Sequence, residues 1–178
     1  MKSLCIFCGA RDGLNEIYRQ EAKLLGKQMA ENEISLIYGG GNVGMMGAIA
    51  DSVIRYGGYV IGVIPKSLVD LELAHPDAHE MIVVENMHKR KERMYALSDA
   101  FLALPGGFGT LDEFCEIFTW FQLGFHKKKI GFLNTDKYFD HLLHHFEHAV
   151  TEGFVDQHLY DTIIVKNNVQ EILPALAE

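Results

Sequence analysis

Two glycine-rich segments contain the residue types that bind phosphate. The first is residues 38–47 (YGGGNVGMMG) and the second is residues 105–113 (PGGFGTLDE). Each follows a short apolar run and precedes an amphipathic one, which is the pattern of a strand-to-helix turn. Glycine allows close approach of the backbone to a ligand, and the free amides of a helix start attract anions. These loops alone are also compatible with tight turns, but two of them, with residues 9–13 as a third, predict a phosphate-containing ligand.

The candidate phosphate contacts come from both loops. Gly106, Gly107, Gly109 and Thr110 would offer amide and hydroxyl donors to the phosphate, and Gly39, Gly40, Gly41 and Gly44 would close around the rest of the ligand.

Common nucleotide cofactors fit these loops poorly. Gly39, Gly41 and Gly44 match the dinucleotide fingerprint formally, but the next predicted strand ends at Pro65-Lys66 and not at the acidic residue that binds a ribose. Neither loop has the G-K-[ST] ending of a Walker motif. The sequence therefore predicts an enzyme or binding protein without an NAD or other cofactor.

A cationic run and a distant carboxylate could act together on a bound ligand. Residues 87–94 (MHKRKERM) begin where a predicted strand ends, and Glu113 lies one turn into the helix behind the second loop. We expect Met87 and Met94 to pack inward, so that Arg90 points to the sheet edge, where its planar fork can bind a phosphate or purine. A solvated cationic face and a carboxylate that only neutralises Arg90 are the alternatives.

The cysteines and histidines do not predict a metal or redox site. Cys5 and Cys8 form a C-x-x-C pair, but the local pattern is that of a strand, in which residues three apart point to opposite faces. A helix containing His141, His144, His145 and His148 has its apolar residues on the opposite face, so the histidines are predicted to be solvated. No metal ligand set is therefore assigned.

The elements that must position these residues alternate regularly along the chain. Strands are predicted at residues 3–7, 34–38, 59–64, 81–84, 100–104, 129–133 and 162–165, and helices at 16–31, 44–56, 88–97, 110–121, 137–151 and 169–177. The strands are apolar at nearly every position, which is typical of a parallel sheet covered on both faces. The sequence thus predicts an α/β fold, a Rossmann-like doubly wound parallel sheet with helices on both faces, and residues 71–80 form its longest irregular stretch.

Length and charge narrow the classes of protein further. A length of 178 residues favours a single domain over residues 1–178, and a charge of −8 (24 acidic and 16 basic residues) argues against non-specific nucleic-acid binding. No apolar run approaches the ~20 residues of a membrane span, and the short apolar N-terminus does not resemble a signal peptide. We expect a cytoplasmic protein with no membrane partner.

The motifs resemble those of the Lonely guy (LOG) family. Residues 105–113 are similar to its PGGxGTxxE motif, residues 87–91 to its second signature and residues 38–47 to its first glycine loop, and the similarity extends through Glu72, His75 and residues 120–124. Ala10-Arg11-Asp12 departs from the more serine-rich first loop of the family, so the phosphate contacts of that loop are not carried over.

The resemblance implies an activity and a set of residues. Family members are phosphoribohydrolases that cleave cytokinin riboside 5′-monophosphates, and often AMP, to free base and ribose 5-phosphate. It implies Arg90 and Glu113 as the essential pair, Met87 and Lys91 as further substrate-binding residues, no metal, and a homodimer. Aromatic residues between Phe114 and Phe125 could form a dimer contact or a monomer core. A non-catalytic nucleotide-monophosphate-binding module and a phosphate-releasing enzyme are the competing functions.

Overall fold

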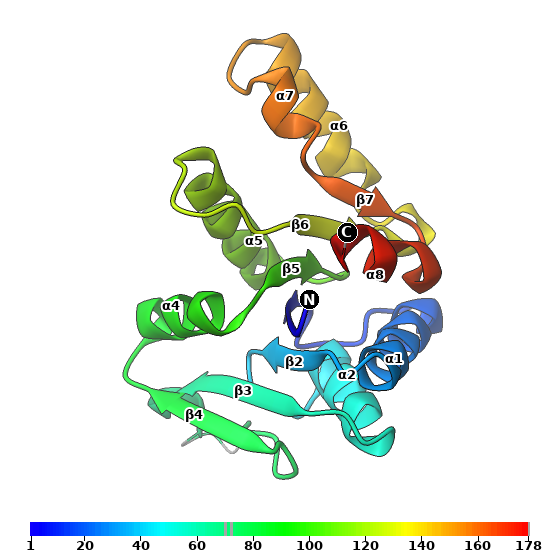
Figure 1. The fold of residues 1–178 in the computed structure, drawn as a ribbon, viewed down its shortest axis with the longest axis vertical. Coiled ribbons are helices and arrows are strands. Elements are labelled where there is room, and N and C mark those ends of the chain that lie inside the picture. The colour runs from blue at the N-terminus through cyan, green and yellow to red at the C-terminus, as the bar shows by residue number, and fades with distance from the viewer. Residues whose placement is uncertain (70, 72, 178) are drawn as a thin grey trace.

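The sheet contains seven parallel strands in the order β4-β3-β2-β1-β5-β6-β7 (Figure 1). The computed structural model describes residues 1–69, 71 and 73–177. The strands are β1 (Ser3–Phe7), β2 (Ser35–Tyr38), β3 (Val60–Pro65), β4 (Glu80–Val84), β5 (Ala100–Ala103), β6 (Ile130–Leu133) and β7 (Ile164–Lys166). The chain moves outward from β1 to β4 and then returns to pair β5 with β1. This reversal creates a topological switch point beside β1, where open α/β sheets bind ligands.

Helices cover both faces of the sheet. They are α1 (Glu16–Glu31), α2 (Gly44–Arg55), α3 (Lys66–Val69), α4 (Met87–Leu97), α5 (Phe108–Gln122), α6 (Asp140–Thr151), α7 (Gln157–Tyr160) and α8 (Val169–Ala177). Figure 1 shows α1, α2 and α8 on one side of the central strands and α4 and α5 on the other. One buried apolar cluster lies between the sheet and α1, α2 and α8, and a second lies between the sheet and α4 and α5. The predicted doubly wound α/β fold is therefore confirmed.

The burial of each strand explains its composition. The inner strands β1, β5 and β6 are buried at nearly every position, whereas the edge strand β4 is at most half-buried. Continuous apolar runs are required in the inner strands because helices cover both of their faces. Cys5 and Cys8 lie in opposite clusters, as the alternation along a strand predicts.

Some local features differ from the prediction. The helix predicted at residues 137–151 begins only at Asp140, because the chain first forms a 3₁₀ turn (Thr135–Lys137) in which Asp136 and Lys137 have φ of 51° and 58°. The short helices α3 and α7 were not predicted, since four residues are too few for a periodic pattern. The predicted irregular stretch at residues 71–80 includes a bridge between Gly41 and Ala74, and Glu72 lies outside the described residues.

The histidine stripe on α6 is exposed, as its opposition to the apolar face predicted. Within residues 1–69, 71 and 73–177 there is no helix with the length and hydropathy of a membrane span.

Candidate active site

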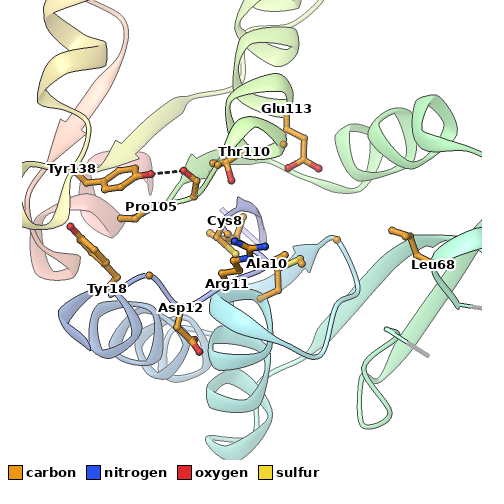
Figure 2. Close-up of a pocket in the computed structure, with 18 of the residues that line it drawn as sticks. Cys8, Ala10, Arg11, Asp12, Tyr18, Leu68, Pro105, Thr110, Glu113 and Tyr138 are labelled. Carbon is orange, nitrogen blue, oxygen red and sulfur yellow. Dashed lines mark hydrogen bonds between the residues drawn. The ribbon is translucent and has the colours of Figure 1, made fainter. Parts of the chain in front are cut away.

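A cavity of about 570 Å³ opens at the carboxyl ends of the central strands (Figure 2). The loops after β1, β2 and β5 form its floor, and α4 and α5 contribute side chains to its wall. The lining residues that carry polar or charged side chains are Arg11, Asp12, Tyr18, Arg90, Thr110, Glu113 and Tyr138. The cavity therefore lies at the switch point that the strand order creates.

The second glycine loop supplies the start of α5 to this cavity. Gly107 is the N-cap of α5 and has no side chain to satisfy the first amides of the helix. Thr110 is 3% exposed, and its hydroxyl oxygen has no hydrogen-bond partner among the described residues. A side chain on Gly106 would collide with that hydroxyl, so glycine is required there. These free donors beside a helix N-terminus form an anion-binding arrangement.

Arg90 and Glu113 meet at the wall of the cavity. Arg90 Nη1 lies 3.0 Å from Glu113 Oε1, and the two residues are 9% and 7% exposed. The Arg90 guanidinium is also held by β3, since its Nε donates a hydrogen bond to the Val63 carbonyl at 3.1 Å. Glu113 Oε1 accepts no well-aligned hydrogen bond from the described residues despite this proximity. The pair predicted to converge is thus in contact, and the carboxylate keeps bonding capacity for a ligand.

Burial changes the acidity of this carboxylate. Burial raises the pKa of Glu113 above its usual range, and the Arg90 guanidinium opposes part of that effect. A buried carboxyl group with a raised pKa next to a cavity is typical of a functional group rather than of a surface cap.

The first glycine loop contributes less to the cavity than the sequence indicated. Gly39 lines it, and a side chain at Gly39 would collide with the Arg90 guanidinium. Gly40, Gly41 and Gly44 do not line it. Gly40 and Gly44 have positive φ values of 78° and 62°, which explains glycine at both positions by backbone geometry alone.

Two residues from the start of α4 are also outside the cavity lining. Met87 is 44% exposed, so the prediction that it packs inward was wrong: it is the first residue after the N-cap Asn86, at the rim of the helix. The Lys91 ammonium lies 3.2 Å from Asp112 Oδ2 and 3.1 Å from Glu116 Oε2. Lys91 therefore links α4 to α5, as the neighbouring Arg90–Glu113 contact does.

Sequence reasoning missed two tyrosines of the cavity. Tyr18 of α1 and Tyr138 stack edge to face, with ring centroids 5.6 Å apart. The Tyr138 hydroxyl donates a hydrogen bond to the Gly106 carbonyl, shown dashed in Figure 2. The two residues before Tyr138, Asp136 and Lys137, have left-handed backbone conformations. No periodic pattern or motif could have identified this contact, because it joins loops that are 32 positions apart.

The remaining cysteine and histidine residues do not form a cluster. The pKa of the Cys5 and Cys8 thiols is raised by burial, as expected for unreactive core cysteines. No group of three or more His, Cys, Asp or Glu side chains in the part of the chain that the structure describes could hold a metal ion.

Known proteins resemble the chain over nearly its full length. A family model described as "Possible lysine decarboxylase" matches residues 46–176. The cytokinin riboside 5′-monophosphate phosphoribohydrolase LOG7 of Arabidopsis thaliana is 42% identical over 99% of this chain and 82% of its own length. LOG2 of the same plant is 43% identical over 99% and 83%, and LOG of Oryza sativa subsp. japonica is 42% identical over 99% and 73%.

Solved structures share the fold at lower sequence identity. The molybdenum cofactor binding protein of Rippkaea orientalis superposes with a TM-score of 0.75 at 20% identity, covering 99% of this chain and 96% of that one. The Moco carrier protein of Chlamydomonas reinhardtii gives 0.72 at 19% identity, covering 98% and 94%. These structures support the fold alone, whereas the matches to several phosphoribohydrolases at about 42% identity cover 99% of this chain. The chain belongs to the LOG family of cytokinin riboside 5′-monophosphate phosphoribohydrolases.

Proposed function

We propose that the protein hydrolyses the N-glycosidic bond of nucleoside 5′-monophosphates, namely cytokinin riboside 5′-monophosphates and/or AMP. The products are the free base and ribose 5-phosphate. The observation that carries this proposal is the contact between buried Arg90 and Glu113 at the wall of a cavity that also contains the free start of α5. That arrangement can bind a phosphate at one end and act on a sugar at the other.

Each group has a role in the proposed reaction. Donors from Gly106, Gly107, Gly109 and Thr110 bind the 5′-phosphate, and Gly39 contacts the nucleotide from β2. The Glu113 carboxylate stabilises the positive charge that develops on C1′ and accepts a proton from the attacking water. Arg90 stabilises the negative charge on the departing base. The C1′–N bond breaks, the water oxygen bonds to C1′, and the base leaves with a proton from solvent.

The name of the matching family model suggests a decarboxylase, which the cavity does not favour. Enzymes that decarboxylate lysine through pyridoxal phosphate hold that cofactor as a Schiff base with a lysine. No lysine lines the cavity among the residues that the structure describes, and Lys91 is engaged by Asp112 and Glu116. The residues present do not fit that cofactor, so no step is assigned to it.

The experiment that tests the function identifies the products. Purified protein is incubated with AMP and with isopentenyladenosine monophosphate, and the products are separated by chromatography. We expect adenine or isopentenyladenine together with ribose 5-phosphate. Inorganic phosphate with a nucleoside would indicate a phosphatase, and nucleotide binding without any product would indicate a binding module; either result contradicts the proposal.

The activity should depend on pH through Glu113. Since the carboxylate must be ionised and burial raises its pKa, kcat/KM for AMP should fall as the pH drops through that raised value. The acid limb is therefore expected above the ordinary glutamate pKa of about 4.3. Measuring ribose 5-phosphate binding over the same range separates this limb from titration of the phosphate group. If ribose 5-phosphate binding fell over the same pH range as kcat/KM, the acid limb would not report on Glu113. An acid limb at the ordinary glutamate pKa would also contradict the assignment of that limb to Glu113.

We further propose that the protein is a cytoplasmic homodimer without nucleic-acid or membrane partners. Leu123 and Phe125, which follow the end of α5, are 61% and 69% exposed, which suits a contact with a second copy. Three free cysteines are compatible with a reducing compartment. The charge of −8 would repel nucleic acid.

A further inference from the structure

The charges around the cavity leave one cation without a partner. Asp12 Oδ2 lies 2.9 Å from Arg19 Nη1, and Arg90 pairs with Glu113. Arg11 also lines the cavity, but it forms no ion pair or hydrogen bond with any residue in the described part of the chain. Since Asp12 is neutralised by Arg19 and Glu113 by Arg90, the Arg11 guanidinium is the lining charge that is available to a bound anion.

The backbone at Arg11 is held firmly even though its side chain is exposed. The Gly9 amide donates a hydrogen bond to the Pro105 carbonyl at 3.1 Å, and the Met45 amide donates one to the Gly9 carbonyl at 3.1 Å. The loop after β1 is thus tied to both other glycine loops. A side chain on Gly44 would collide with the Ala10 carbonyl and the Arg11 amide, so this loop packs directly on the start of α2. These contacts fix the point from which the guanidinium reaches into the cavity.

Arg11 faces the helix start that offers the other anion donors. Figure 2 shows Thr110 and Glu113 extending from α5 toward the loop that carries Ala10 and Arg11. Gly9 is in direct contact with Gly106, since a side chain on Gly106 would meet the Gly9 amide at 2.7 Å. The unpartnered Thr110 hydroxyl, the start of α5 and Arg11 therefore line the same cavity. A phosphate bound there would satisfy all three.

We propose that Arg11 is the side-chain ligand of the 5′-phosphate and makes the site select phosphorylated over unphosphorylated nucleosides. The proposal rests on the proposed function for the identity of the substrate. A phosphate monoester carries about −1.5 to −2 charges at pH 7, and a guanidinium can bind two of its oxygens at once. The helix start supplies only partial charges, so Arg11 provides the one full charge that matches the ligand.

The test compares Arg11→Gln, Arg11→Lys and the control Arg55→Gln. Arg55 is an exposed residue of the last turn of α2 and does not line the cavity, so its replacement changes the net charge equally. Calorimetry measures the Kd for ribose 5-phosphate, and base release gives kcat/KM for AMP and adenosine. Losing one charge-assisted contact should weaken ribose 5-phosphate binding and lower kcat/KM for AMP by about 10- to 100-fold in Arg11→Gln. Arg11→Lys should retain part of the affinity for ribose 5-phosphate and part of kcat/KM for AMP. Arg55→Gln should change neither quantity. The activity on adenosine should be the same in all three variants as in the parent protein.

The outcomes distinguish a failure of the proposed role of Arg11 from a failure of the proposed hydrolase activity. Unchanged ribose 5-phosphate binding in Arg11→Gln would overturn the role of Arg11, even if the parent protein releases base. An equal loss of activity on AMP and adenosine would also overturn it, because that result indicates a damaged fold rather than lost phosphate recognition. If the parent protein binds ribose 5-phosphate but releases no base, the proposed function fails, and the effect of Arg11→Gln on that binding still decides the role of Arg11. Absence of binding by the parent protein at millimolar ribose 5-phosphate would overturn the phosphate site.

Discussion

Replacing Glu113 by glutamine is expected to lower kcat for base release from AMP by about 10²- to 10⁴-fold, with a much smaller change in KM. Glutamine keeps the shape of the side chain but carries no negative charge to stabilise C1′ and cannot accept a proton from water. The phosphate donors at the start of α5 are untouched, so the substrate should still bind. Steady-state kinetics with adenine detection measures both constants.

The neighbouring carboxylate provides a matched control for Glu113. Asp112 lies one position earlier on α5, and its side chain is 61% exposed and faces Lys91. Asp112→Asn makes the same chemical change and should retain most of the activity, since Glu116 still engages Lys91 at 3.1 Å. If Glu113→Gln turned over AMP as well as Asp112→Asn does, Glu113 would have no part in the chemistry.

Replacing Arg90 by alanine is expected to affect both activity and stability. Loss of the guanidinium should lower kcat/KM by about 10²- to 10³-fold, the range found when a transition-state donor is removed. It also leaves the Glu113 carboxylate buried without its cation, which should lower the free energy of unfolding by about 3 kcal/mol. Base-release kinetics and urea unfolding measure the two effects. Arg93→Ala, an exposed change on the same helix, should alter neither.

A double variant separates the two consequences of losing Arg90. In Arg90→Ala combined with Glu113→Gln, no buried carboxylate remains, so most of the lost stability should return. Activity should not return, because both groups are absent. Recovery of turnover with recovery of stability would show that Arg90 only supports the fold, and a stable Arg90→Ala protein with normal kcat/KM would remove the residue from the mechanism.

The sequence specified the sheet because burial on both faces requires long apolar runs. The boundaries of β1, α1 and α8 match the predicted ranges, and those of α1 coincide with the caps Asn15 and Asn32. The start of α6 was wrong because Asp136 and Lys137 adopt left-handed conformations that their residue types do not require. The conformational preferences of single residues do not predict such a segment when contacts with the rest of the fold determine its backbone conformation.

The convergence of Arg90 and Glu113 was predictable, but its surroundings were not. Both residues follow the carboxyl ends of parallel strands, which necessarily meet at one edge of the sheet. The exposure of Met87 and the engagement of Lys91 depend on how α4 rotates and on which α5 carboxylates it meets. The cavity-facing position of Arg11 depends on the packing of three loops against one another. None of these is encoded in the spacing of a single segment.

The hydrogen bond from Tyr138 to the Gly106 carbonyl connects the ligand end of the cavity to the far half of the sheet. The next residue, Phe139, lies in an apolar cluster, and its amide donates a hydrogen bond to the side-chain oxygen of Asn134 after β6. The orientation of the Gly106–Gly107 peptide is therefore set by residues that belong to neither glycine loop. Insertions or deletions between β6 and α6 should consequently change affinity for phosphorylated ligands, although that connection contains no residue of either signature motif.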